Sequence, residues 1–452
     1  MKYTKEALLL CAALCLTAPA VSAADNILPE KFSKAITADL QHRPQDIVIR
    51  KIAVPAAPAA SAQTAAPRPG ALPAGGTAAS ELLKDTSLTD QIFGSYGDDE
   101  NALRITGASV ILDKAEIVKA AGSSSSPENG DFFGVNAALL ASDGAQVTIS
   151  DSSAESSVMN GNALFSRDRN TVINAARTVI RTSGPHSAGL MTAGGLIRAE
   201  EPDIITQGDF SSPVRAGQNG GVITVQKGTL VSAGYNAPVI RSAGDIAVYQ
   251  SKLAAARSAG VILIGKSKVA LEDCELEGNM APERKSGDVT VREEQTASVL
   301  LLRSANCGTP AGPAEFSMKG GLLLSHRGAV FCVNRTEGIL SLENVKLKNE
   351  DPEAVLLRAA GRPGEAGKAQ VTFRKQKAEG KILTDRDSSL DLTLAQGTVF
   401  KGTISGEAAT GSGTVLHIAK GARWELTGDS TVRSLDCKGQ IEKNGHTLTV
   451  LE

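Results

Sequence analysis

Apolar residues recur along the middle of this chain in three columns that share one long period. Within each column, successive members lie 22 to 26 residues apart. The first column consists of Leu139, Leu164, Leu190, Val214, Val239 and Val261. The second consists of Val147, Val172, Ile197, Ile223, Ile246 and Val269, and the third, seven residues further on, of Ala154, Val179, Ile204, Leu230, Leu253 and Leu276. Columns that stay in step for six repeats indicate a repeat architecture.

Each repeat has the pattern of three short strands separated by turns. Apolar and polar residues alternate in segments such as 147–149 and 223–225, as they do when one face of a strand is buried. Glycines such as Gly144 and Gly208 mark the turns. Strands this short cannot bury an apolar face alone, whereas stacked coils bury it in a continuous ladder. We therefore predict an all-β fold, a right-handed parallel β-helix; a β-sandwich, the alternative, does not account for the long period.

The predicted β-helix covers residues 101–452. Val110, Leu112 and Ile117 extend the columns backwards, ahead of an insertion at residues 123–131. After Gly278 the repeats become irregular, and the columns cannot be aligned between residues 281 and 410. We expect residues 281–286 and 359–368 to form loops on one side of a rod of about 14 coils, stacked at the usual ~4.8 Å strand spacing.

The segments before residue 101 have different compositions. Residues 1–23 have the charged start, apolar stretch and small residues of a signal peptide, and the apolar stretch is too short for the alternative, a membrane anchor. Residues 24–52 have no clear structure, and residues 53–79 form an Ala/Pro-rich, disordered linker. In residues 80–100 we expect a short helix, at 80–92, that caps the open end of the β-helix. No segment of the mature chain has the ~20 apolar residues of a membrane helix.

Charge and cysteine content narrow the classes of partner and site. The formal net charge is −2 and no basic run is present, so we expect no nucleic-acid partner. Cys274, Cys307, Cys332 and Cys437 remain after removal of the signal, and four cysteines allow three complete pairings. The alternative is that they are small buried residues in strands, which suits Cys274 and Cys332.

No constellation of residues in the sequence predicts catalysis, a metal or a cofactor. A β-helix lyase or hydrolase needs acidic residues stacked on adjacent coils, often with calcium. The two outward columns after column two are Ser150, Ala175, Glu200, Gln226, Tyr249, Glu272 and Asp151, Ala176, Glu201, Lys227, Gln250, Asp273. Neither has acids on adjacent coils. The histidines are scattered, at His42, His186, His326, His417 and His446. Only Asp385, Asp387 and Asp391, with Arg386, form a charge group that favours an enzyme.

The repeats resemble bacterial adhesin-like parallel β-helix proteins. Residues 136–145 with 147–152, and residues 187–195, carry this resemblance, and residues 424–430 with Ile441 and 444–446 are similar to the end of autotransporter-type passengers. A translocator barrel normally follows such a passenger and does not follow Glu452, so we expect a chain without the translocator. The resemblance implies the fold and adhesion by analogy.

The function we expect is that of a non-catalytic, exported scaffold at the cell surface or in the periplasm. It would be adhesin-like and present flat faces and loops to a glycan or protein partner, and would need no metal to fold. The alternative is a polysaccharide lyase or glycoside hydrolase of the β-helix type.

Overall fold

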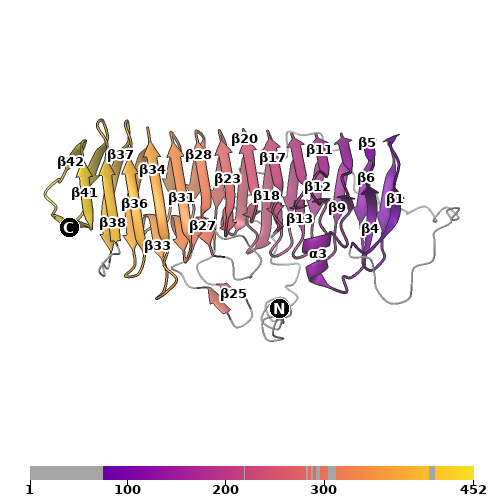
Figure 1. The fold of residues 1–452 in the computed structure, drawn as a ribbon, viewed down its shortest axis with the longest axis horizontal. Coiled ribbons are helices and arrows are strands. Elements are labelled where there is room, and N and C mark those ends of the chain that lie inside the picture. Colours follow the sequence, from indigo (N-terminus) through magenta and orange to yellow (C-terminus); the bar gives the residue numbers. More distant parts are fainter. Residues whose placement is uncertain are drawn as a thin grey trace.

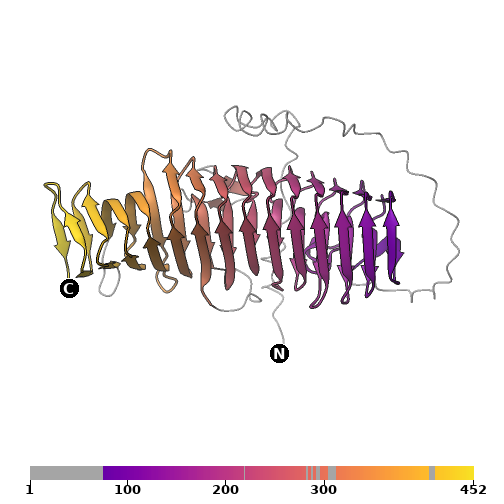
Figure 2. The same ribbon diagram turned by 90° about the horizontal axis from the view of Figure 1, so that it is seen from above.

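The computed structural model describes residues 75–217, 219–280, 284–286, 289–291, 296–303, 312–406 and 413–452. They form an all-β solenoid of about 13 turns, in which parallel strands stack along one long axis (Figures 1 and 2). The predicted parallel β-helix is confirmed. The predicted signal peptide, the segment 24–52 and most of the linker lie outside the described residues.

Three long parallel sheets, here called A, B and C, form the sides of the solenoid. Sheet A contains β1 (Thr77–Leu82), β4 (Glu100–Thr106), β7 (Leu139–Ser142), β10 (Leu164–Arg167), β13 (Ala188–Ala193), β16 (Ser212–Ala216), β19 (Ile240–Ser242), β22 (Val261–Ile264), β27 (Ala297–Leu302), β30 (Ala329–Asn334), β33 (Val355–Ala360), β35 (Lys377–Thr384), β37 (Val399–Gly406), β39 (Arg423–Leu426) and β42 (Gln440–Glu442). Sheet B contains β2 (Thr86–Thr89), β5 (Ser109–Asp113), β8 (Gln146–Ser150), β11 (Val172–Ala176), β14 (Leu196–Glu200), β17 (Val222–Gln226), β20 (Asp245–Tyr249), β23 (Ser267–Glu272), β28 (Ala314–Lys319), β31 (Glu337–Glu343), β34 (Lys368–Arg374), β36 (Ser389–Leu394), β38 (Gly413–Ile418) and β41 (Ser434–Cys437).

Sheet C is shorter and ends before the C-terminal coils. It contains β3 (Ile92–Ser95), β6 (Glu116–Lys119), β9 (Ser153–Ser156), β12 (Val179–Thr182), β15 (Asp203–Thr206), β18 (Thr229–Tyr235), β21 (Lys252–Arg257), β24 (Glu275–Gly278), β29 (Leu322–Ser325) and β32 (Lys346–Asn349). Beyond it, β40 (Ser430–Val432) pairs with β43 (Leu448–Val450). Each coil of the central part therefore contributes one strand to A, one to B and one to C.

The three apolar columns line the inside of the solenoid, with three members displaced by one residue. The inward residues that pair in the structure are Ile173, Ile180 and Ile240 rather than the predicted Val172, Val179 and Val239. Each error falls on a doublet of β-branched residues, where either neighbour could face inward, and a slip of one residue exchanges the two faces of a strand. The spacing between columns two and three stays at seven residues throughout.

The first coil was predicted wrongly. Residues 80–100 form strands and not a helical cap, and the last residues of the predicted linker already belong to β1. β1 alternates exposed and half-buried positions and pairs in register with β4. Leu82, Leu88 and Phe93 pack against the core as the inward residues of this coil. Their spacing of six and five residues suits three strands, and tertiary pairing decides against the helix.

The corner between sheets B and C has the same geometry in successive coils. One residue per coil adopts a left-handed conformation, with φ between 48° and 54°, at Asp90, Lys114, Asp151, Arg177, Glu201, Lys227, Gln250 and Asp273. The backbone N–H of each donates to a carbonyl of the next coil at 2.8–3.1 Å. This bond joins the coils at the corner and offsets the cost of the left-handed backbone, which is about 1–2 kcal/mol for a residue with a side chain.

Two insertions occur at the corner between sheets C and A. The helix α3 (Pro127–Phe133) overlaps the predicted insertion at 123–131 and ends two residues beyond it, and the insertion after β24 contains the antiparallel pair β25 (Arg284–Ser286) and β26 (Val289–Val291). Both lie on the same side of the solenoid in Figure 1. Two groups of apolar residues on the outer face of sheet A are buried, one around Leu140, Phe165 and Met191 and one around Ile262 and Leu300.

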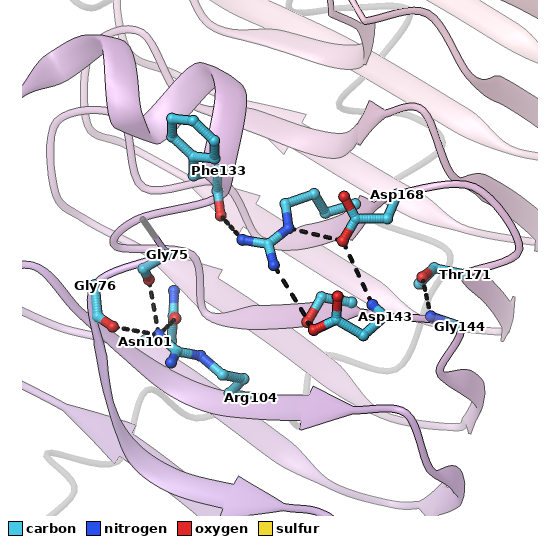
Figure 3. Close-up of polar contacts among 11 residues, drawn as sticks. Gly75, Gly76, Asn101, Arg104, Phe133, Asp143, Gly144, Asp168 and Thr171 are labelled. Carbon is cyan, nitrogen blue, oxygen red and sulfur yellow. Dashed lines mark hydrogen bonds and ion pairs between the residues drawn. The ribbon is translucent and has the colours of Figure 1, made fainter. Parts of the chain in front are cut away.

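Arginine side chains tie the first coils to the chain around them (Figure 3). The guanidinium of Arg104 donates to the carbonyls of Gly75 and Gly76 at 2.7 and 2.8 Å. Arg167 donates to the Phe133 carbonyl at the end of α3 and forms an ion pair of 3.0 Å with Asp168.

Within the described ranges, no helix combines the length and apolar composition that crossing a membrane requires.

Candidate functional site

The outer face of sheet B presents a long column of exposed and half-buried side chains. In register order this column is Ser87, Ile111, Thr148, Asn174, Arg198, Thr224, Ala247, Ala270, Ser317, Ser341, Thr372, Thr393 and His417. Four consecutive members, from Ala247 to Ser341, are alanine or serine. Because these side chains are short, the face is hollowed at this point.

The hollow is a shallow groove of about 280 Å³. Ala270, Ser317 and Ser341 form its floor, and Tyr249, Glu272, Lys319 and Glu343 line it on the side of the corner with sheet C. The residue Tyr249 is 37% exposed. A flat ring beside small side chains and hydroxyl groups is a surface on which a sugar or a peptide strand could lie.

Charges of opposite sign alternate along this wall of the groove. The Lys319 ammonium donates to the Glu272 carboxylate at 2.7 Å, and this hydrogen bond raises the pKa of Lys319. Glu343 is the register partner of Lys319 on the next coil. The Glu272 carboxylate in this wall is therefore already engaged by a cation.

The left-handed residues of the corner between sheets B and C also alternate in charge. In the structure Arg177, and not the predicted Ala176, follows Asp151 in this column, and Glu201 and Lys227 come next. Arg177 forms an ion pair of 2.6 Å with Asp151, and its hydrogen bond lowers the pKa of that carboxyl. A second hollow, of about 390 Å³, lies between Arg177, Glu201 and Lys227. With a cation between each pair of acids, the column lacks the adjacent oxygen ligands that calcium needs.

The fold does not bring the charged residues that favoured an enzyme together into one site. The Asp385 carboxylate accepts hydrogen bonds from the backbone N–H groups of Gly361, Asp387 and Ser388, at 2.5, 3.2 and 2.9 Å, and so holds a turn. Arg386 and Asp387 are exposed in that turn. Asp391 points outward on β36, away from the turn, where its Oδ1 lies 3.7 Å from His417 Nε2. Asp385 and Asp387 therefore belong to one turn, whereas Asp391 lies on the strand that follows it.

The described histidines occupy separate places. His326 lies between the carboxylates of Glu277 and Glu350, at 3.5 and 2.8 Å, and their hydrogen bonds raise its pKa. His417 has a second acid, Asp436, 3.7 Å from its Nδ1, and His446 lies 4.0 Å from Asp429. Among the residues that the structure describes, no three His, Cys, Asp or Glu side chains are grouped so that they could hold a metal ion.

Two of the described cysteines differ sharply in their surroundings. Cys274 is fully buried at the corner between sheets B and C, where its thiol contacts the carbonyls of Val248 and Glu272 at 3.3 Å. Cys437 is exposed on β41. Neither forms a disulfide, so none of the three complete pairings occurs in the structure. Cys332 is buried on the outer face of sheet A, and burial raises the pKa of its thiol to about 12.

We expect alkylation to distinguish Cys274 from Cys437. Iodoacetamide should modify Cys437 in the native protein and Cys274 only after unfolding, because burial shields the Cys274 thiol and raises its pKa. Peptide mass spectrometry of samples labelled with and without urea measures both sites. Equal labelling of the two under native conditions would contradict the placement of Cys274 inside the solenoid.

The fold and these surfaces define a class, that of parallel β-solenoid proteins with a flat polar face. Comparison of the chain with protein families, curated proteins and solved structures gave no match.

Proposed function

We propose that this protein is a non-catalytic, exported β-helix scaffold that holds a surface partner on the outer face of sheet B. The observation that carries the proposal is the groove beside Tyr249, whose floor is made of small side chains and whose wall contains the Lys319–Glu272 ion pair. Such a surface presents an aromatic ring and hydroxyl groups on a flat sheet, rather than reactive side chains. A glycan strand is the partner that these features favour.

Stiffness supports the same proposal. Every described strand of sheet B pairs in parallel with its neighbours, so the face is one continuous sheet of 14 strands. A partner with repeated units can contact several coils at once, and weak contacts then add through effective concentration. The predicted signal peptide would export the chain, and the Ala/Pro-rich segment would separate the solenoid from its point of attachment.

The groove can be tested by filling it. In a screen of the purified protein on glycan and matrix-protein arrays, Ala270→Arg should lower the binding of any captured partner by about tenfold or more, since a central contact is typically worth over 1 kcal/mol. Thr148→Arg, at an exposed position of the same column, is the matched control and should bind like the wild type. Capture that survives Ala270→Arg would place the binding surface elsewhere.

The enzyme alternative needs a separate assay. Incubation with pectins, alginates, glycosaminoglycans and xylans should give neither unsaturated products nor new reducing ends. Turnover of any of these polymers, lost on changing Asp385, Asp387 or Asp391 to alanine, would replace the scaffold by a lyase or hydrolase.

A further inference from the structure

Two arginines lie side by side on the outer face of sheet A. The outward column here reads Arg104, Leu140, Phe165, Met191, Arg215, Arg241, Ile262, Leu300, Cys332 and Arg358. Arg215 and Arg241 are direct register partners on adjacent strands, at the usual strand spacing of about 4.8 Å. They stand between the two buried apolar groups of this face, which include Met191 on one side and Ile262 on the other.

Only one of the two arginines has an acidic partner within the described residues. Arg215 donates to the Asp131 carboxylate of α3 at 2.6 Å. The guanidinium of Arg241 makes no hydrogen bond or ion pair with the part of the chain that the structure describes. Burial, and then the neighbouring Arg215, lower the pKa of Arg241 to about 10. Like charges directly opposite each other in a sheet are unfavourable, so this arrangement carries a cost in the absence of an anion.

An aromatic pair lies beside the arginines at the corner between sheets C and A. The rings of His186 and Phe210 stack with centroids 4.8 Å apart and an angle of 3° between their planes. Both residues have a left-handed backbone, with φ of 57° and 59°, at positions where the flanking coils carry Asn160 and Asn236. Asparagine and histidine adopt this conformation readily, whereas the bulky Phe210 is an outlier of the kind found at functional sites.

The charge of this cluster is positive. Burial, and then Arg215, lower the pKa of His186 and so favour its neutral form. The nearby Asp209 is engaged, because its carboxylate accepts the Tyr235 N–H at 2.8 Å and lies 3.9 Å from Arg257. The guanidinium groups of Arg215 and Arg241 carry two positive charges, and the Asp131 carboxylate carries one negative charge. The cluster therefore has one positive charge in excess.

The geometry points to a binding site for an acidic saccharide, in which Arg215 and Arg241 take its carboxylate or sulfate group and Phe210 contacts the sugar ring. Guanidinium groups bind such planar or tetrahedral anions through paired hydrogen bonds. The aromatic pair favours a ligand with a carbon framework over a free inorganic ion. This site is on sheet A and does not depend on the groove of sheet B, so either proposal can fail alone.

Calorimetric titration with four probes tests the assignment. Hexagalacturonate and a sulfated heparin hexasaccharide present the two anionic groups, maltohexaose is the neutral oligosaccharide, and potassium phosphate is the inorganic anion. We expect saturable binding of at least one acidic hexasaccharide and none of maltohexaose. Phosphate that binds as tightly as both acidic saccharides would overturn the saccharide assignment, and failure of both to bind would overturn the site.

Charge variants give effects of opposite sign. Arg241→Gln should weaken binding about tenfold or more, since it removes charge-assisted hydrogen bonds to the bound anion. Asp131→Asn should tighten binding, because it removes the carboxylate that competes for Arg215. Arg169→Gln, in an exposed turn outside both proposed binding surfaces, is the control and should bind like the wild type. Equal affinity of Arg241→Gln and the wild type would overturn the proposal.

A measurement without any ligand checks the premise. Arg241→Met should raise the melting temperature in low-salt, anion-free buffer, because it replaces an unpaired charge with an apolar side chain of similar length. A lower melting temperature for this variant would show that Arg241 stabilises the fold itself, and would overturn its assignment to a ligand.

Discussion

Replacing Ile223 with aspartate should abolish cooperative folding of the solenoid. Ile223 is fully buried in the middle of the inner ladder, between Ile197 and Ile246 on the neighbouring coils. A carboxylate at this position would be buried without a partner, which costs several kcal/mol even when the group becomes protonated. Circular dichroism during urea unfolding measures the effect, as loss of the native transition.

The adjacent residue is the control. Thr224 points outward on the same strand, where Arg198 and Ala247 are its neighbours. Thr224→Asp keeps its charge in water beside an arginine and should unfold like the wild type. If the two variants unfolded alike, the register of sheet B would be wrong.

Gly208→Ala should destabilise the solenoid by roughly 3 kcal/mol, the upper end of what overpacking costs. A Cβ atom at Gly208 would overlap the backbone carbonyl of Gly184 on the preceding coil, and Gly234 stands in the same relation to Gly208. Backbone atoms cannot turn aside as a flexible side chain can, so the two coils must separate locally. The midpoint of urea unfolding measures this cost.

Gly144→Ala is the matched control for this prediction. Gly144 has a φ of +84°, but no atom lies within 4 Å of the Cβ that alanine would add. Only the left-handed backbone is strained there, at a cost of about 1–2 kcal/mol. A larger loss of stability for Gly144→Ala than for Gly208→Ala would contradict the close packing of the corner between sheets C and A.

The inner ladder could be predicted from the sequence because its signal is both periodic and chemical. Between columns two and three the corner always has the same length, so a spacing of seven residues identified both. The corner between sheets A and B varies, with eight residues from Leu139 to Val147 but six from Ile240 to Ile246. Aligning the columns at a nearly even spacing therefore assigned the wrong residue of each β-branched doublet to the interior. The same alignment failed after Gly278, where insertions lengthen the coils.

The groove and the arginine pair could not be predicted from the columns that were compared. A hollow depends on the lengths of side chains from four coils, and two of these coils, with Ser317 and Ser341, lie in the part that could not be aligned. The arginine pair did leave a signal, because Arg215 directly follows Val214 of the first column. Arg241 was hidden by the displacement of its neighbour, Val239 having been taken for Ile240.

The corner between sheets B and C has the same geometry in successive coils, so distances along the rod change in steps of one coil. Since each coil advances the chain by one strand spacing, about 4.8 Å, features on different sheets can change their separation only by that increment. Arg241 on β19 and Ser317 on β28 are two coils apart, which corresponds to roughly 10 Å along the axis. Deleting or duplicating a complete coil between such features would alter the reach of the molecule while every remaining coil kept its own surface. The length of this protein is thus adjustable independently of its chemistry.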